Sequence, residues 1–287
     1  MPDSYDTREA ASRQLLSAGE GILPLLEPLS RHPSPEVRFR VQSIVRSLAQ
    51  VPLRRLQEEI AAFCSQPEER LDVERAMCFI ARLMDRQVVE KDLLRMLDEM
   101  AAKVTEHLAN DGDPDPSRAD PQKAVAAIQQ VVYKDYALRG NDEDYGNPDN
   151  SSLAFVLKER KGKPILLAEI TVSVARRAKI PIVGIPTGGR YIAKYDGAQA
   201  PAGFPRDDIY LDPFGGGVVL TREDRLRLFP NYDPDRMVPP ATRRETIARI
   251  LRNIVTDYRG RGAAADPDGQ ELAERMLELL TVPMAVP

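Results

Sequence analysis

One stretch of the sequence is apolar on almost every face of the helix that it predicts. This helix covers Ile165–Ala178, and its apolar positions are Ile165, Leu166, Leu167, Ala168, Ile170, Val172, Val174 and Ala175. A helix with apolar residues all round is buried on most sides. Other elements must therefore surround it, and this requirement limits the fold more than any other feature of the chain.

Short strand-like pieces follow this helix, and a Thr-Gly-Gly turn at 187–189 joins the first two. The pieces are Ile182–Ile185, Arg190–Tyr195, Ile209–Leu211 and Val218–Leu220. A buried helix packed on a few short antiparallel strands is an α+β core. The sequence therefore predicts an α+β fold with one buried helix on a small antiparallel sheet.

The N-terminal part reads as a pair of helices that is similar to a HEAT repeat. The first, EGILPLLEPLSRH, has Pro28, which is expected to end or kink it, and its apolar positions are Ile22, Leu25, Leu26 and Leu29. The second, PSPEVRFRVQSIVRSL, carries an apolar stripe of Val37, Val41, Ile44, Val45 and Leu48. Only one such unit is present, whereas solenoids need about three to be stable alone.

Further helices are predicted on both sides of the core. They cover Leu53–Phe63, Glu68–Leu83, Val88–Leu108, Pro121–Tyr136, a segment from about Ser151, Thr242–Tyr258 and Asp268–Leu280, the last two forming a hairpin across RGRGAAADPDG. We therefore divide the chain into a HEAT-like segment (1–66), a core (67–235) and a C-terminal helical hairpin (236–287).

Charge and composition argue against several classes of partner. The net charge is −4 over 287 residues, and no long basic run offers a phosphate-binding face for nucleic acid. No segment approaches the roughly 20 apolar residues of a membrane helix, and the start lacks the layout of a signal peptide. The two cysteines, Cys64 and Cys78, lie in predicted helical segments. We expect both to be reduced and mostly buried. We expect a cytoplasmic protein that binds neither nucleic acid nor membrane.

Metal and nucleophile sites find little support in the sequence. His32 and His107 have no ligand spacing between them, and the acidic stretch NDEDYGNPDNSS fails the register of a calcium loop. We expect no metal and no cofactor. A serine or threonine nucleophile with Lys163 or Lys194 as its base stays open as an alternative.

Several ordered motifs resemble the SirB-type branch of the transglutaminase-like family. They are the turn GNDEDYGNPDNSS, the start KGKPILLAEI of the apolar helix, and DPFGGG near the last strands. The matching positions are Asn141, Tyr145, Asn150, Ser151, Gly162 and Pro164. The resemblance implies a papain-like core, which in active members carries a cysteine at the start of the buried helix, a histidine on a strand and an aspartate on the next.

The resemblance leaves two of these three catalytic positions unmatched. Asp212 matches the aspartate, but Arg190 falls where the family has histidine, and Pro164 to Ala168 contain no Cys, Ser or Thr. Arginine stays protonated near neutral pH and cannot act as a base. We interpret Arg190 and Asp212 as degenerate triad positions that form a salt bridge, with Glu169 as a second partner of Arg190 or a side chain that points outward.

These observations predict a non-catalytic protein that acts as a protein-interaction scaffold, because helical repeats suit partner binding. Two alternatives stay open. One is a hydrolase or acyl transferase with an unconventional nucleophile, and the other is a small-anion-binding protein whose former cleft takes a carboxylate.

Overall fold

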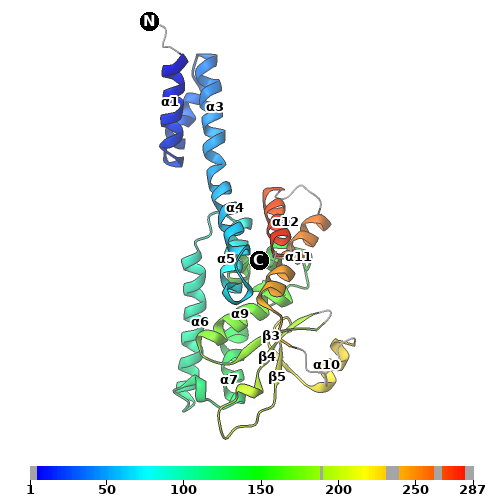
Figure 1. The fold of residues 1–287 in the computed structure, drawn as a ribbon. Helices are drawn as coiled ribbons and strands as arrows, with labels where there is room; N and C mark the ends of the chain where they lie inside the picture. Colours follow the sequence, from blue (N-terminus) through cyan, green and yellow to red (C-terminus); the bar gives the residue numbers. More distant parts are fainter. Residues whose placement is uncertain (1–4, 188–189, 231–238, 262–266, 282–287) are drawn as a thin grey trace. The chain divides into compact units, whose positions relative to one another are not determined.

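The computed structural model describes residues 5–187, 190–230, 239–261 and 267–281. The chain divides into two compact units, Met1–Phe63 and Cys64–Pro287. The second unit holds the sheet, the buried helix and the C-terminal helices (Figure 1).

The first unit is helical throughout its described part. It contains α1 (Tyr5–Ser17), η1 (Glu20–Ile22), α2 (Leu23–Leu26), η2 (Glu27–Arg31), α3 (Pro35–Ala49) and most of α4 (Val51–Cys64). Its core consists of Leu26 together with Val41, Ile44 and Leu48, which belong to the predicted stripe of α3.

The first predicted helix of this unit differs from the structure. The segment is broken into three short turns, and η2 has Pro28 in its first turn, as expected for a residue that cannot continue a helix. Leu25 is 72% exposed and Leu29 is 41% exposed, so these two apolar positions of the predicted helix contribute little to the core. Helix α1 was not predicted, because YDTREAASRQLLS carries too few apolar residues for a clear stripe.

Most helices of the second unit lie close to their predicted positions. They are α5 (Val73–Met84), α6 (Glu90–Asn110), α7 (Pro121–Ile128), α8 (Leu153–Glu159), α9 (Pro164–Arg177), α10 (Arg222–Leu228), α11 (Arg243–Arg261) and α12 (Pro267–Thr281), with 3₁₀ turns at η3 (Glu68–Arg70), η4 (Pro116–Arg118), η6 (Pro148–Ser151) and η7 (Gly197–Gln199). Short α10 was not predicted.

Two of the predicted helices differ from the structure, one at its start and one in its second half. The helix expected from Glu68 begins only at Val73, because the Asp72 carboxylate accepts hydrogen bonds from the backbone N–H groups of the first turn. The helix expected over Pro121–Tyr136 changes after Ile128 into the π-helical turn η5 (Gln129–Asp135). Such turns insert an extra residue into a helix and are frequent at functional sites.

The sheet is antiparallel, as predicted, in the order β3 (Ile182–Pro186), β4 (Tyr191–Tyr195), β5 (Ile209–Asp212) and β6 (Val218–Leu220). Gly184 pairs with Ala193, and Ala193 pairs with Leu211. Gly188 and Gly189 of the predicted turn lie outside the described residues. A separate parallel pair of two-residue strands, β1 (Arg139–Gly140) and β2 (Lys161–Gly162), was not predicted.

Helix α9 is buried along most of its length and packs against β3 and β4 (Figure 1). Helices α5, α6, α7 and α11 also contact it. These contacts confirm the predicted α+β core around an apolar helix.

The predicted C-terminal helices are both present, and α11 packs against α12, α5 and the turn η6. Residues 262–266, which join the two helices, lie outside the described residues. Both helices belong to the same compact unit as the sheet. Among the described residues, no helix is long and apolar enough to cross a membrane.

Candidate functional site

The start of α9 is where the family resemblance places a nucleophile. Pro164 and Ile165 are buried there, and the residues up to Ala168 present no hydroxyl or thiol. The preceding residue, Lys163, donates from its backbone N–H to the Asn150 carbonyl oxygen at 2.9 Å. This end of α9 is therefore held by the polar turn before it and offers an apolar surface.

The side chain of Lys163 is buried in an ion pair. Its Nζ lies 2.9 Å from Oδ1 of Asp257 on α11, and the two side chains are 5% and 7% exposed. The ammonium also lies 4.3 Å from the centre of the Tyr145 ring, a cation–π geometry. Burial raises the pKa of Asp257, and the hydrogen bond from Lys163 partly offsets this rise. The ammonium of Lys163 thus pairs with the Asp257 carboxylate.

Arg190 and Asp212 lie next to each other at one end of the two central strands, β4 and β5. Nη1 of Arg190 is 3.3 Å from Oδ2 of Asp212, whose side chain is only 5% exposed, whereas that of Arg190 is 39% exposed. Oδ1 of Asp212 accepts a hydrogen bond from the Phe214 backbone N–H at 3.1 Å. The guanidinium also lies 5.4 Å from the centre of the Phe214 ring. One contact to the carboxylate leaves most of the five N–H donors of Arg190 for other acceptors.

The other motif residues form the polar turn that borders this site. Asn141 Nδ2 donates to Asn150 Oδ1 at 2.8 Å, and Asn150 Nδ2 donates to the backbone oxygen of residue 144 at 2.7 Å. Gly162 is needed because a Cβ there would come within 2.7 Å of a Val156 methyl group. The Ser151 Oγ is buried without a hydrogen-bond partner among the described residues. These contacts give Asn141, Asn150 and Gly162 structural roles.

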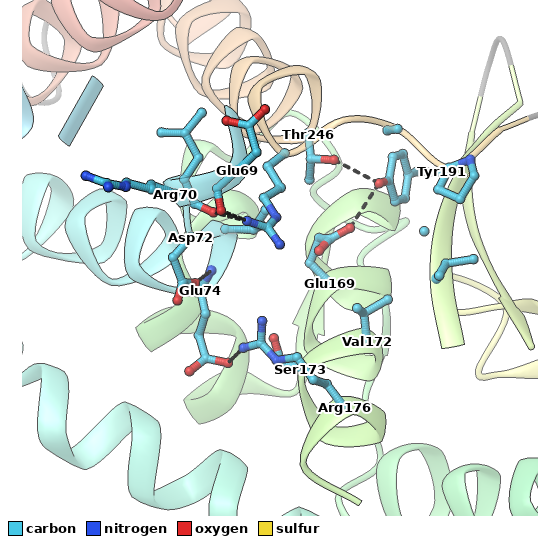
Figure 2. Close-up of a pocket in the computed structure, with 17 residues that line it drawn as sticks. Glu69, Arg70, Asp72, Glu74, Glu169, Val172, Ser173, Arg176, Tyr191 and Thr246 are labelled. Atoms are coloured by element: carbon cyan, nitrogen blue, oxygen red, sulfur yellow. Dashed lines mark hydrogen bonds and ion pairs between the residues drawn. The ribbon is translucent and has the colours of Figure 1, made fainter. Parts of the chain in front are cut away.

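Glu169 does not approach Arg190 and does not point outward. Its Oε1 accepts a 2.9 Å hydrogen bond from the Tyr191 hydroxyl, which lies 3.1 Å from Thr246 Oγ1 (Figure 2). The side chain is 6% exposed, and burial raises the pKa of Glu169 to about 7. Gly184 permits this arrangement, since a Cβ there would lie 2.5 Å from the Tyr191 hydroxyl.

A cavity of about 300 Å³ opens beside Arg190 and the start of α9. We call it the Arg190 cleft. Its apolar and aromatic wall is formed by Tyr145, Pro164, Ile165 and Tyr191, and its polar wall by Arg190, Arg249, Arg252 and Asn253. Three cationic side chains thus converge on one concave site.

A second cavity, of about 530 Å³, is lined by Glu169 and also by Tyr191 (Figure 2). Its wall also carries Glu74, which accepts hydrogen bonds from Arg176 at 2.8 Å and from Arg177 at 2.5 and 2.7 Å. Carboxyl and guanidinium groups thus line this cavity together, and Glu74 pairs there with Arg176, whereas no carboxyl group of the described residues lines the Arg190 cleft.

In the described part of the chain, neither cavity is lined by a cysteine or a histidine. Burial raises the pKa of the Cys64 thiol to about 11 and that of Cys78 to about 12, and both thiols are free. His107 Nε2 lies 3.6 Å from an Asp135 carboxylate oxygen near the end of α6. No cluster suited to a metal ion occurs among the described residues. Lys194, the other lysine considered as a base, pairs with Asp208 at 2.8 Å.

The arginines of α11 were missed by the sequence analysis. Arg249, Arg252 and Asn253 have the spacing of one helix face in the stretch ARILRN. The sequence shows that these three residues share a helix face, but which face of α11 meets α9 depends on the tertiary packing. The Tyr191–Glu169 hydrogen bond was also missed, although a single carboxyl group on an otherwise apolar helix predicts some buried partner.

Comparison with known proteins identifies relatives of this chain. A model described as the transglutaminase-like superfamily matches residues 91–252, more than half of the chain. A UPF0162 protein of Xylella fastidiosa is 34% identical over 145 residues, which cover 47% of this chain and 48% of that protein. A UPF0162 protein of Pseudomonas aeruginosa is 26% identical over 189 residues, 63% of each chain.

A eukaryotic protein also matches. The mouse F-box only protein 21 is 26% identical over 135 residues, which cover 47% of this chain and 22% of that protein. The chain spans about half the length of the first of these relatives. No solved structure matches the chain.

Proposed function

The chain belongs to the transglutaminase-like superfamily, and we propose that it uses this fold as a non-catalytic protein-interaction scaffold. The observation that carries the proposal is the pairing of Asp212 with Arg190 at 3.3 Å. Where the family resemblance implies a histidine base, a permanently protonated guanidinium faces the carboxylate. Proton abstraction from a nucleophile therefore has no base at this position.

The residues at the start of α9 support the same conclusion. Pro164 and Ile165 occupy the start of α9 with no thiol or hydroxyl group. The two cysteines have raised pKa values because they are buried, so little thiolate forms near neutral pH. Lys163 and Lys194 each form an ion pair with an aspartate, which opposes their use as bases for an unconventional nucleophile.

The proposal also covers the family branch, the N-terminal helices and the partner. We place the chain in the SirB-type branch, because the motif residues Asn141, Asn150 and Gly162 interlock around the start of α9. The helices of the first unit form a HEAT-like unit in this proposal, and another protein in the cytoplasm is the expected partner. No cofactor is assigned.

Turnover assays test the non-catalytic role. The purified chain is incubated with amide, ester and glutamine–amine substrates at pH 7–9, beside Arg190→His and Ser151→Ala variants. We expect no turnover from any of them, since Arg190→His restores a base without a nucleophile. Turnover by the unaltered chain that Ser151→Ala abolishes would show an unconventional enzyme instead.

Reconstitution tests the scaffold role. A protein captured by the intact chain from its own cytoplasm is purified and mixed with the purified chain, and the complex is followed by size-exclusion chromatography. We expect co-elution at a fixed stoichiometry. If captured proteins consistently fail to co-elute once purified, the scaffold role is wrong.

A further inference from the structure

The arginines of the Arg190 cleft come from two separate elements. Arg190 precedes β4, whereas Arg249 and Arg252 lie on α11 at i and i+3, on one side of the helix. Within the described ranges, neither Arg249 nor Arg252 has a carboxylate at ion-pair distance. Arg190 contacts Asp212 through a single nitrogen. The cleft therefore contains guanidinium N–H groups, most of which have no carboxylate partner among the described residues.

Local charge sets this cleft apart from the rest of the molecule. The chain as a whole has a net charge of −4, so its overall field does not attract anions. In the second cavity, Glu74 already pairs with Arg176 and Arg177. Among the described residues that line the Arg190 cleft, none carries a carboxyl group, and the nearby Asp212 pairs with Arg190.

We propose that the Arg190 cleft binds a carboxylate attached to an apolar body, an inference that rests on the proposed non-catalytic role. Guanidinium groups bind carboxylates through paired, charge-assisted hydrogen bonds. The apolar body would contact Ile165 and the half-exposed ring of Tyr145. A cavity of about 300 Å³ is at the small end of ligand sites, which fits one side chain or a compact organic acid.

The carboxylate can come from an acidic side chain of a partner protein or from a free small acid, and both present the same chemistry. Asp212 stays in place in either case, because its Oδ1 is already bonded to the Phe214 backbone. The incoming carboxylate uses the N–H groups of Arg190 that face away from Asp212, together with those of Arg249 and Arg252. Asp212 thus acts as a positioning residue for Arg190.

Calorimetric titration of the full chain at low ionic strength tests the inference. The first probe is 3-phenylpropionate, and its control is 3-phenylpropionamide, which has the same shape without the charge. We expect the acid to bind with a Kd of about 1 mM or lower and the amide to bind at least about tenfold more weakly. Equal affinity for acid and amide, or no binding of the acid, would overturn the inference.

Matched variants locate the binding. Arg252→Gln removes an exposed guanidinium of the cleft, and Arg275→Gln removes one that is 61% exposed on α12 and pairs within its own helix. We expect Arg252→Gln to weaken the binding of 3-phenylpropionate by about tenfold, and we expect Arg275→Gln to leave this affinity unchanged. Equal effects of the two substitutions would mean that the acid binds through general charge attraction, and the site would be refuted.

Two further probes identify the source of the carboxylate. A blocked peptide with one glutamate between two leucines represents a partner protein, and inorganic phosphate represents other anions. Tighter binding of the peptide than of 3-phenylpropionate supports a partner protein, and the reverse order supports a free acid. Binding of phosphate alone would refute a carboxylate site. Failure of all binding leaves the non-catalytic role untouched, whereas substrate turnover would overturn that role by a separate measurement.

Discussion

The buried carboxyl group of Glu169 should make the stability of the protein fall as pH rises. Its pKa is raised from an ordinary value of 4.5 to about 7, chiefly because the group is buried, and the hydrogen bond from Tyr191 opposes that rise. Between these two pH values the folded state holds a proton that the unfolded state has released. The folded state is therefore favoured at low pH, and this advantage disappears as the pH rises through about 7.

The size of the effect follows from the two pKa values. Each unit of difference corresponds to about 1.36 kcal/mol, so the full change amounts to about 3 kcal/mol. Between pH 5 and pH 8 the part due to Glu169 is about 2.5 kcal/mol. The charged group that favours the ionised form is Arg176. Because Arg176 already hydrogen-bonds to Glu74, we expect it to offset little of this cost.

Urea unfolding of the unaltered chain and of Glu169→Gln at pH 5, 6, 7 and 8 measures this contribution. Glutamine keeps the shape and can still accept the Tyr191 hydrogen bond, but it does not titrate. Far-UV circular dichroism suits a chain without tryptophan. We expect the variant to gain about 2.5 kcal/mol over the parent between pH 5 and pH 8. Asp149 and Asp257, whose pKa values are also raised by burial, titrate in both proteins and cancel in the difference.

Parallel pH profiles of the two proteins would refute this reasoning. They would mean that the Glu169 carboxyl group titrates near its ordinary pKa of 4.5 and that water reaches it. A carbon-13 titration of the carboxyl group decides the matter directly, since a midpoint near 4.5 contradicts burial as the dominant effect.

The remaining predictions concern the cysteines, the ion pair and one glycine. Both buried cysteines should react with iodoacetamide at pH 7.5 at least about 100-fold more slowly than glutathione, because burial raises their pKa values; fast stoichiometric labelling would contradict this. Arg190→Ala should cost between ~1 kcal/mol, typical of exposed pairs, and ~3 kcal/mol, typical of a buried carboxylate left alone, and a double-mutant cycle with Asp212→Asn should show coupling rather than additivity. Gly184→Ala should cost about 1–3 kcal/mol in thermal or urea unfolding, because the new methyl group would lie 2.5 Å from the Tyr191 hydroxyl and 2.7 Å from Glu169 Oε1.

Gly146→Ala is the matched control for the glycine substitution. A Cβ at Gly146 has no neighbouring atom within 4 Å, and its φ is not positive. We expect the stability to change by less than about 0.5 kcal/mol. Equal losses at Gly184 and Gly146 would show that loss of glycine flexibility, and not contact with Tyr191, causes the effect.

The sequence predicted the features that depend on local pattern. The apolar residues of α9 and the short strands after it carry clear periodicity, and their α+β arrangement is confirmed. Helix boundaries were predicted wrongly where a single polar side chain determines them, as Asp72 does at the start of α5. The helix ends before Pro28, as expected, but the exposure of Leu25 and Leu29 could not be predicted from their helical spacing.

The site was harder to predict, because it combines distant segments. Arg190 and Asp212 were found through motif positions, and the structure shows their separation. The contribution of α11 depends on which face of that helix meets α9, and no local pattern carries this information. The partner of Glu169 likewise depends on the register of β3 and β4, which places Gly184 where the Tyr191 ring passes.

The ion pair between Lys163 and Asp257 has a consequence for synthesis of the protein on the ribosome. Its two members are 94 positions apart in the chain. At about 5–20 residues per second, Asp257 is made roughly 5 to 19 seconds after Lys163. Until then the ammonium at the start of α9 has no counter-charge, and burying it alone is strongly unfavourable. The nascent chain should therefore keep this end of α9 hydrated until α11 has left the exit tunnel, and a ribosome stalled before residue 243 should carry an incompletely packed core.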